Sequence, residues 1–166
     1  NPVAIINKVD RRVMDQSIKF LESTGYTGFA NFDIKYDSRD GSYNYFEINT
    51  RLGRSNFYIT GSGFNAVKWI VDDLIYGKEF EEDMVIADNE NLYTVIPKDI
   101  ALSYAGDEEI RDHVRRLYDE GKVSNPIDYK EEKNVIHKLY VKYFMRQQGK
   151  CFREFMRKEG VEYVAK

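Results

Sequence analysis

The spacing of apolar residues predicts a helix near the start of the chain. Between residues 10 and 24, apolar side chains recur at intervals of three and four positions, as on one face of an amphipathic helix: Val13, Met14, Ile18 and Leu21. Asp10 is suited to the N-cap because its carboxylate can accept hydrogen bonds from free backbone amides of the first turn. Gly25 is suited to the C-terminal stop because glycine readily adopts the left-handed conformation.

The next two segments alternate between polar and apolar residues, which predicts a β-hairpin over residues 28–37 and 42–51. The sequence SRDG lies between them. Arg39, Asp40 and Gly41 suit a three-residue loop in which the glycine is left-handed. With that loop Ser38 faces Ser42, and the numbers of facing residues add up to 80 along the whole hairpin.

Beyond the hairpin the pattern predicts mainly helices. A break at TGSG, residues 60–63, precedes an amphipathic helix that begins near residue 66 and ends near Gly77. The charged sequence GKEFEED predicts a loop, and LYTVI predicts a short strand stopped by Pro97. Two further helices are predicted over residues 107–120 and 130–158, with a turn at SNP between them.

These elements predict an α+β fold in two parts. Residues 1–105 would hold an antiparallel sheet backed by helices, and residues 106–166 would form a helical extension. At 42% hydrophobic content, a chain of 166 residues can bury one good core.

The last predicted helix is basic and carries an apolar stripe. The stripe consists of Ile136, Leu139, Tyr140, Tyr143 and Phe144. The favoured interpretation is a helix that packs its stripe inside and exposes its basic side to solvent. The alternative is that the basic side binds an anionic partner, a membrane surface or nucleic acid.

Composition narrows the class of protein. A net charge of -3 and a pI near 5.5 argue against a protein that mainly binds nucleic acid. No apolar run is long enough to span a membrane, and the first residues do not resemble a signal peptide. Cys151 is the single cysteine, so we expect a reducing compartment, by default the cytoplasm, and a buried thiol. The start at Asn1 suggests a piece of a longer protein.

The predicted hairpin places a polar cluster on one face. Side chains alternate along a strand, so this face would carry Asn31, Asp33, Glu47, Asn49 and Arg51. Asp33 would lie opposite Glu47, and two opposed carboxylates repel unless a cation or a shared proton relieves them. Two carboxylates and an amide oxygen suit Mg²⁺ with positions left open for phosphate. Spacing alone leaves open a solvent-facing cluster in which Lys35 or Arg51 neutralises Asp33.

The hairpin sequence resembles a known family. The stretch GFANFDIKYDSRDGSYNYFEINTRLGRS resembles the end of the ATP-grasp domain, in which one acidic residue and a following Glu-x-Asn motif ligate the magnesium ions of ATP. Asp33, Glu47 and Asn49 match that pattern. The stretch EINTRLGRSNFYITGSGFN is similar to sequences of the carboxylate–amine ligase branch, which includes D-aspartate ligases and carbamoyl-phosphate synthase-like proteins. Asn31 departs from the D-alanine–D-alanine ligase pattern, which has arginine there, so Arg51 or Arg54 would supply that charge.

The resemblance implies an enzyme that uses ATP and Mg²⁺ or Mn²⁺ to join a small carboxylate and an amine through an acyl phosphate. It implies metal ligation by Asp33, Glu47 and Asn49, and ATP binding by these residues together with Asn31 and Arg51. Arg51 and Arg54 would act in catalysis, and Arg54, Ser55 and Ser62 would contact substrate. The glycine-rich loop and the phosphate-binding lysines would lie in an upstream ATP-grasp portion of the same protein. We therefore expect this segment alone to bind MgATP weakly and to be inactive.

A second function remains open. The chain could be a non-enzymatic binding module in which the hairpin is scaffold and the basic helix engages an acidic partner.

Overall fold

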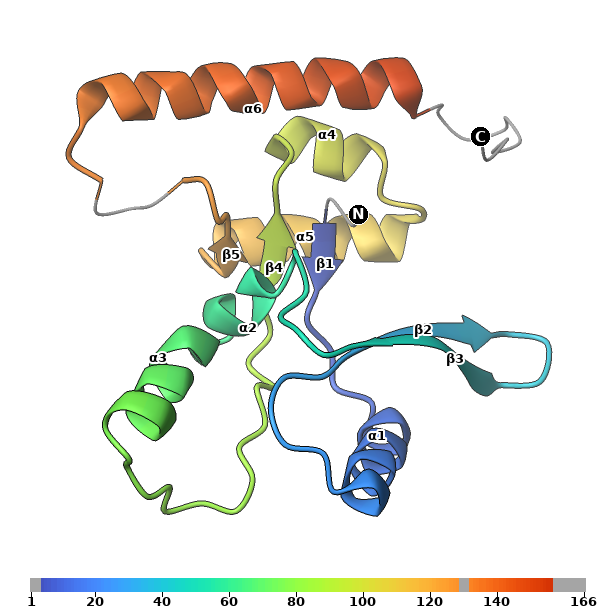
Figure 1. The fold of residues 1–166 in the computed structure, drawn as a ribbon. Coiled ribbons are helices and arrows are strands. Elements are labelled where there is room, and N and C mark those ends of the chain that lie inside the picture. Colours follow the sequence, from blue (N-terminus) through green and yellow to red (C-terminus); the bar gives the residue numbers. More distant parts are fainter. Residues whose placement is uncertain (1–3, 129–131, 157–166) are drawn as a thin grey trace. The chain divides into compact units, whose positions relative to one another are not determined.

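The computed structural model describes residues 4–128 and 132–156. Two compact units are present, one formed by Lys8–Asn56 and the other by Asn1–Asn7 together with Phe57–Lys166. The first combines one helix with a two-stranded sheet and the second combines several helices with a three-stranded sheet, which confirms the predicted α+β class (Figure 1). The predicted boundary at residue 105 stays a prediction. No helix in the described residues is long and apolar enough to cross a membrane.

The first unit opens with helix α1, Arg11–Thr24. Its ends are those predicted from the sequence. The Asp10 carboxylate accepts a hydrogen bond from the Arg12 backbone amide at 2.9 Å, and Gly25 adopts the left-handed conformation with φ of 62°. Local capping therefore determines where this helix begins and ends.

Strands β2, Asn31–Asp37, and β3, Ser42–Asn49, form the predicted antiparallel hairpin, but its turn differs from the prediction. Asp37 rather than Ser38 pairs with Ser42, so the loop has four residues. The Gly41 amide donates to the Asp37 carbonyl at 2.8 Å. The Asp37 carboxylate accepts from the backbone amide and guanidinium of Arg39, which favours this wider turn.

The register changes within the hairpin at a β-bulge. Tyr45 pairs with Ile34, whereas Glu47 pairs with Asp33, and the extra residue between them is Phe46. Beyond the bulge the pairing agrees with the predicted register, so Asn31 lies opposite Asn49. Phe46 is 70% exposed, although it is apolar and lies within a strand.

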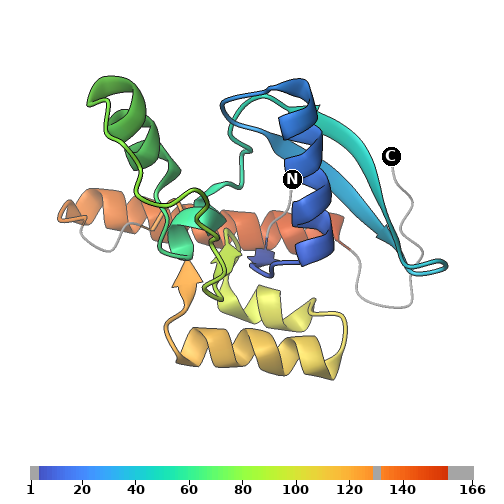
Figure 2. The ribbon, with the colours of Figure 1, turned by 90° about the horizontal axis from the view of Figure 1, so that it is seen from below.

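Helix α1 lies against the hairpin (Figure 2) and contacts its aromatic side chains. Phe32 makes edge contacts with the rings of Phe20 and Tyr45, at centroid distances of 6.3 and 5.8 Å. The Tyr45 hydroxyl donates to the Val13 carbonyl at 3.1 Å, and the Tyr43 hydroxyl donates to the Asp10 carboxylate. Hydroxyls at the far ends of apolar rings therefore join the two elements.

The second unit has a three-stranded sheet, of which only one strand was predicted. The strands are β1, Ala4–Ile6, β4, Leu92–Thr94, and β5, Val123–Ser124, in the order β1-β4-β5. β4 runs antiparallel to β1 and parallel to β5. Helices α4, Lys98–Ser103, and α5, Glu108–Asp119, supply the rest of the core. Its buried residues are Leu92, Ile96, Ile100, Ala101, Val114 and Leu117.

The predicted helix after TGSG is present, and its second half is π-helical rather than α-helical. Helix α2, Phe57–Gly61, comes before the break, and helix α3, Ala66–Ile70, continues as the π-helical segment η1, Val71–Ile75. The Asn65 side chain caps α3 by accepting from the amides of Val67 and Lys68. The loop before α3 therefore ends in a side-chain cap.

Helix α6, Val135–Phe155, forms where the last helix was predicted. The prediction extended from residue 130 to residue 158, and residues 130, 131, 157 and 158 lie outside the described residues. Its buried residues are Val141 and Gly149, and Phe152 packs on the Tyr104 ring at 4.8 Å. The apolar stripe that begins at Ile136 is largely exposed, so the prediction that it packs inside was wrong. Cys151 is exposed as well, contrary to expectation.

Deletion of Phe46 should leave both halves of the hairpin in place. Because Phe46 has no cross-strand partner, Asp33 can still face Glu47 and Ile34 can still face Tyr45. Deletion of Asn44 is the matched control, because Asn44 pairs with Lys35 across the hairpin. Its loss shifts Tyr43 by one position and so turns the Tyr43 side chain away from α1. We expect the Asn44 deletion to lower the free energy of unfolding by about 1 kcal/mol more. Cross-strand nuclear Overhauser effects and urea titrations test this, and a changed Asp33 partner after Phe46 deletion contradicts it.

The Asp10 carboxylate should stabilise the first unit in a pH-dependent way. Hydrogen bonds from Tyr43 first, and from Arg12, lower the pKa of Asp10 from 3.8 to about 2. The stabilisation is therefore full above the unfolded pKa and is lost as pH falls toward 2. The stability difference between wild type and Asp10→Asn should shrink as pH falls from 5 to 2 in urea titrations followed by circular dichroism. Carboxylates common to both proteins cancel, and a constant difference contradicts the assignment.

Candidate functional site

The polar face of the hairpin gathers four of the predicted site residues. Asn31 and Asp33 come from β2, and Glu47 and Asn49 come from β3, as two directly facing pairs. Facing β-carbons lie ~4.5–5.5 Å apart in such pairs. The carboxylate residues are exposed and the two asparagines are half-buried. The face is thus a shallow row of oxygen atoms open to a ligand.

Two hydrogen bonds organise this face. Nδ2 of Asn31 donates to Oδ1 of Asp33 at 3.3 Å. Nη2 of Arg51 donates to Oδ1 of Asn49 at 3.2 Å, and Nη1 donates to the Leu52 carbonyl at 3.2 Å. The guanidinium of Arg51 therefore binds the amide oxygen that the sequence assigns to a metal ion.

Among the described residues, the two facing carboxylates have no cationic partner. Within residues 4–128 and 132–156, no ion pair joins Asp33 or Glu47 to a lysine or arginine side chain. The alternative in which Lys35 or Arg51 neutralises Asp33 is therefore not seen. The described residues also contain no group of three or more His, Cys, Asp and Glu side chains placed to hold a metal ion. Any metal on this face must use amide or external oxygens as well.

Sequence reasoning missed the contribution of Gly53. A β-carbon at position 53 would lie 2.8 Å from Oδ1 of Asn31, so the backbone there approaches the Asn31 side chain more closely than other residues allow. The glycine in the sequence LGR was the available signal. Gly53 thereby restricts the orientation of the Asn31 amide.

The remaining predicted site residues are distributed over both units. Arg54, which is exposed, and Ser55, which is half-buried, follow β3 in the turn closed by the Asn56 amide and the Gly53 carbonyl at 3.2 Å. Ser62 belongs to the other unit and is 1% exposed.

The Ser62 hydroxyl is engaged in internal hydrogen bonds. It accepts from Nδ2 of Asn7 at 2.8 Å and donates to the Tyr58 carbonyl at 3.1 Å. The Ser62 carbonyl accepts from Nδ2 of Asn89 at 2.8 Å. The substrate contact predicted for Ser62 stays a prediction.

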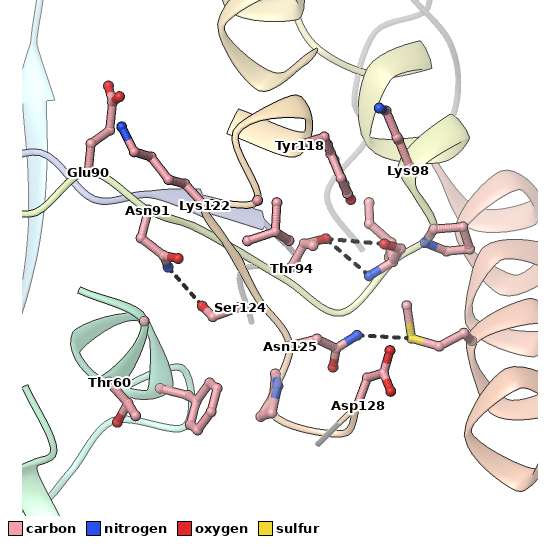
Figure 3. Close-up of a pocket in the computed structure, with 18 residues that line it drawn as sticks. Thr60, Glu90, Asn91, Thr94, Lys98, Tyr118, Lys122, Ser124, Asn125 and Asp128 are labelled. Atoms are coloured by element: carbon pink, nitrogen blue, oxygen red, sulfur yellow. Dashed lines mark hydrogen bonds between the residues drawn. The ribbon is translucent and has the colours of Figure 1, made fainter. Parts of the chain in front are cut away.

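The second unit contains a cavity of about 910 Å³ that the sequence did not indicate (Figure 3). On one wall, Nδ2 of Asn91 donates to the Ser124 hydroxyl at 2.7 Å. This pair lies against Gly61, where a β-carbon would clash with Nδ2 of Asn91. Strand β5 supplies Ser124 to this wall, and that strand is too short to be predicted from its sequence.

Glu90 lies on the rim of the same cavity and joins two basic side chains of α5. Its carboxylate contacts Nε2 of His113 at 2.6 Å and Nη2 of Arg116 at 3.1 Å. The hydrogen bond with His113, together with the charge of Arg116, lowers the pKa of Glu90. The sequence does not indicate this contact, because Glu90 and His113 are 23 positions apart in the chain.

Comparison with known proteins gives one relative. Over 164 residues the chain is 34% identical to the D-aspartate ligase of Enterococcus faecium (strain Aus0004). The aligned region covers 96% of this chain and 39% of that protein. No protein-family model matches the chain, and no solved structure matches it.

Proposed function

We propose that the polar face of the hairpin is the metal- and phosphate-binding end of the active site of an ATP-dependent carboxylate–amine ligase. The proposal rests on one observation. Asp33 faces Glu47 across the hairpin, and Asn31 faces Asn49 beside them. The similarity to a D-aspartate ligase supports a ligase-type function. Because the chain spans 39% of that relative, the activity of the whole protein is part of the proposal.

The side chains on this face fit a hard divalent cation. Asp33 and Glu47 offer carboxylate oxygens with no cationic partner in the described residues, and Asn49 offers an amide oxygen. Mg²⁺ and Mn²⁺ prefer such oxygen ligands and keep other positions for water or phosphate. Bound there, the ion would neutralise negative charge on the ATP phosphates.

The arginines and the neighbouring polar groups have separate roles in this proposal. Arg51 leaves Asn49 and turns its planar guanidinium toward a phosphate group, two oxygens of which can accept parallel hydrogen bonds. Arg54 adds positive charge near the transferring phosphoryl group. The Asn31 amide contacts ATP from the other strand, and Arg54 and Ser55 contact the substrates.

The proposed reaction forms an amide in two steps. An oxygen of the substrate carboxylate attacks the γ-phosphorus of ATP, the bond to ADP breaks, and an acyl phosphate forms. The amine nitrogen then attacks the acyl carbon, phosphate leaves, and the nitrogen loses a proton. The protein contributes mainly positioning and charge stabilisation to the first step. D-Aspartate is the first carboxylate to test, because the relative is a D-aspartate ligase.

Mn²⁺ should bind to the hairpin of this chain. Because Mn²⁺ is paramagnetic, it should broaden the amide signals of Asp33 and Glu47 and the side-chain signal of Asn49 before others. Glu47→Gln should weaken binding about tenfold or more by removing one of two carboxylates. Glu22→Gln, which removes an acid from α1, is the matched control and should leave binding unchanged. Broadening centred on the acidic run Glu79 to Asp83 instead would contradict the metal site.

Catalysis should depend on the same residues in the complete protein encoded by the gene. With D-aspartate, an amine and MgATP, we expect ADP, phosphate and amide in equal amounts. Glu47→Gln and Arg51→Lys should each lower kcat about 10²-fold or more, since a lysine cannot copy a bidentate guanidinium. Glu22→Gln should keep full activity. Full activity in Glu47→Gln, or ADP formation without amide, would remove the ligase proposal.

A further inference from the structure

Helix α6 exposes an apolar stripe that the second unit leaves uncovered within the described residues. The exposed fractions are 68% for Val135, 79% for Ile136, 61% for Leu139, 58% for Tyr140 and 60% for Tyr143. These positions are three and four residues apart, so they form one continuous face about two turns long. Contiguous exposed apolar surface of this kind is typical of an interaction site.

The stripe cannot be buried by the packing that already holds α6. The helix contacts the unit through its opposite side, where Gly149 lies against Pro97 and Phe152 lies against the Tyr104 ring. At ~100° per residue, the buried Val141 and the packed Phe152 lie about 140–180° around the helix axis from Leu139 and Tyr143. Along α6, the outer side of the helix has no neighbour from the described part of the unit (Figure 1).

A row of positive charges borders the stripe. Lys138, Lys142, Arg146 and Lys150 follow one another at intervals of four and therefore lie along one edge of the helix. No ion pair to any of these four occurs among the described residues, whereas the neighbouring Arg153 is paired with Asp99 at 2.6 Å. Like charges at this spacing repel one another, so an anionic ligand beside the helix is favoured.

We propose that this face of α6 binds peripherally to an anionic lipid surface. Lipid phosphates would neutralise the basic row, while Leu139 and the rings of Tyr140 and Tyr143 would enter the boundary between headgroups and acyl chains. A second copy of the helix is a poorer partner because two positive rows would meet. The attraction is local, since the chain as a whole carries a net charge of -3. The proposal is independent of the ligase function.

Co-sedimentation with vesicles tests the proposal. We expect the 166-residue chain to sediment with vesicles of phosphatidylcholine and phosphatidylglycerol, more strongly at low than at high salt, and not with phosphatidylcholine alone. Lys138→Gln with Lys142→Gln should lower the partition coefficient ~25-fold, about fivefold for each charge near the surface. Leu139→Ser with Tyr143→Ser should lower it at least tenfold. These side chains are exposed, and circular dichroism verifies that each variant folds.

Two control variants make the test specific to α6. Lys8→Gln with Lys19→Gln removes the same charge from the other unit, and Leu74→Ser with Ile75→Ser removes equally exposed apolar side chains from η1. Both should bind the anionic vesicles as the wild type does. No sedimentation, equal sedimentation with neutral vesicles, or equal losses in the controls would overturn the proposal and leave the face to a protein partner.

Discussion

The hairpin of the first unit meets two demands that require different registers, and the extra residue at Phe46 reconciles them. Near the turn, Tyr43 and Tyr45 must face α1, because their hydroxyls donate to groups of that helix. Farther along, Glu47 must face Asp33 on the opposite side of the sheet. With the turn register throughout, Asp33 would face Phe46 and Glu47 would turn toward the helix. The bulge changes the register by one, so the packed face and the polar face are both kept.

The sequence predicted the features that depend on neighbouring residues. The cap at Asp10, the stop at Gly25 and the hairpin itself are local, and the structure has all three. The sequence did not predict the four-residue turn. The length of the turn depends on the hydrogen bonds that the Asp37 carboxylate and the Gly41 amide form with backbone groups. Strands β1 and β5 have three and two residues, too few for a periodic signal, and they form through pairing with β4.

Helix α6 shows what periodicity leaves undetermined. The intervals of three and four identify an apolar face, but they do not say whether that face turns toward the same chain. The structure packs α6 through Gly149 instead, where the absence of a side chain lets the helix approach Pro97. Val141 is buried on that side and Leu139 is exposed, although both are apolar. The orientation therefore reflects specific contacts, namely Gly149 with Pro97 and Phe152 with Tyr104, rather than the number of apolar side chains on each face.

At the candidate site, the contact between Arg51 and Asn49 links two roles that the sequence assigned separately. Oδ1 of Asn49 accepts from the Arg51 guanidinium, and under the proposed function the same oxygen ligates a divalent cation. Both cations would compete for one oxygen, so metal binding frees the guanidinium in the place where ATP phosphates arrive. Because such coupling is reciprocal, phosphate that draws Arg51 away also strengthens metal binding at Asp33 and Glu47. Metal and nucleotide would then bind together more tightly than either alone, without movement of the hairpin backbone.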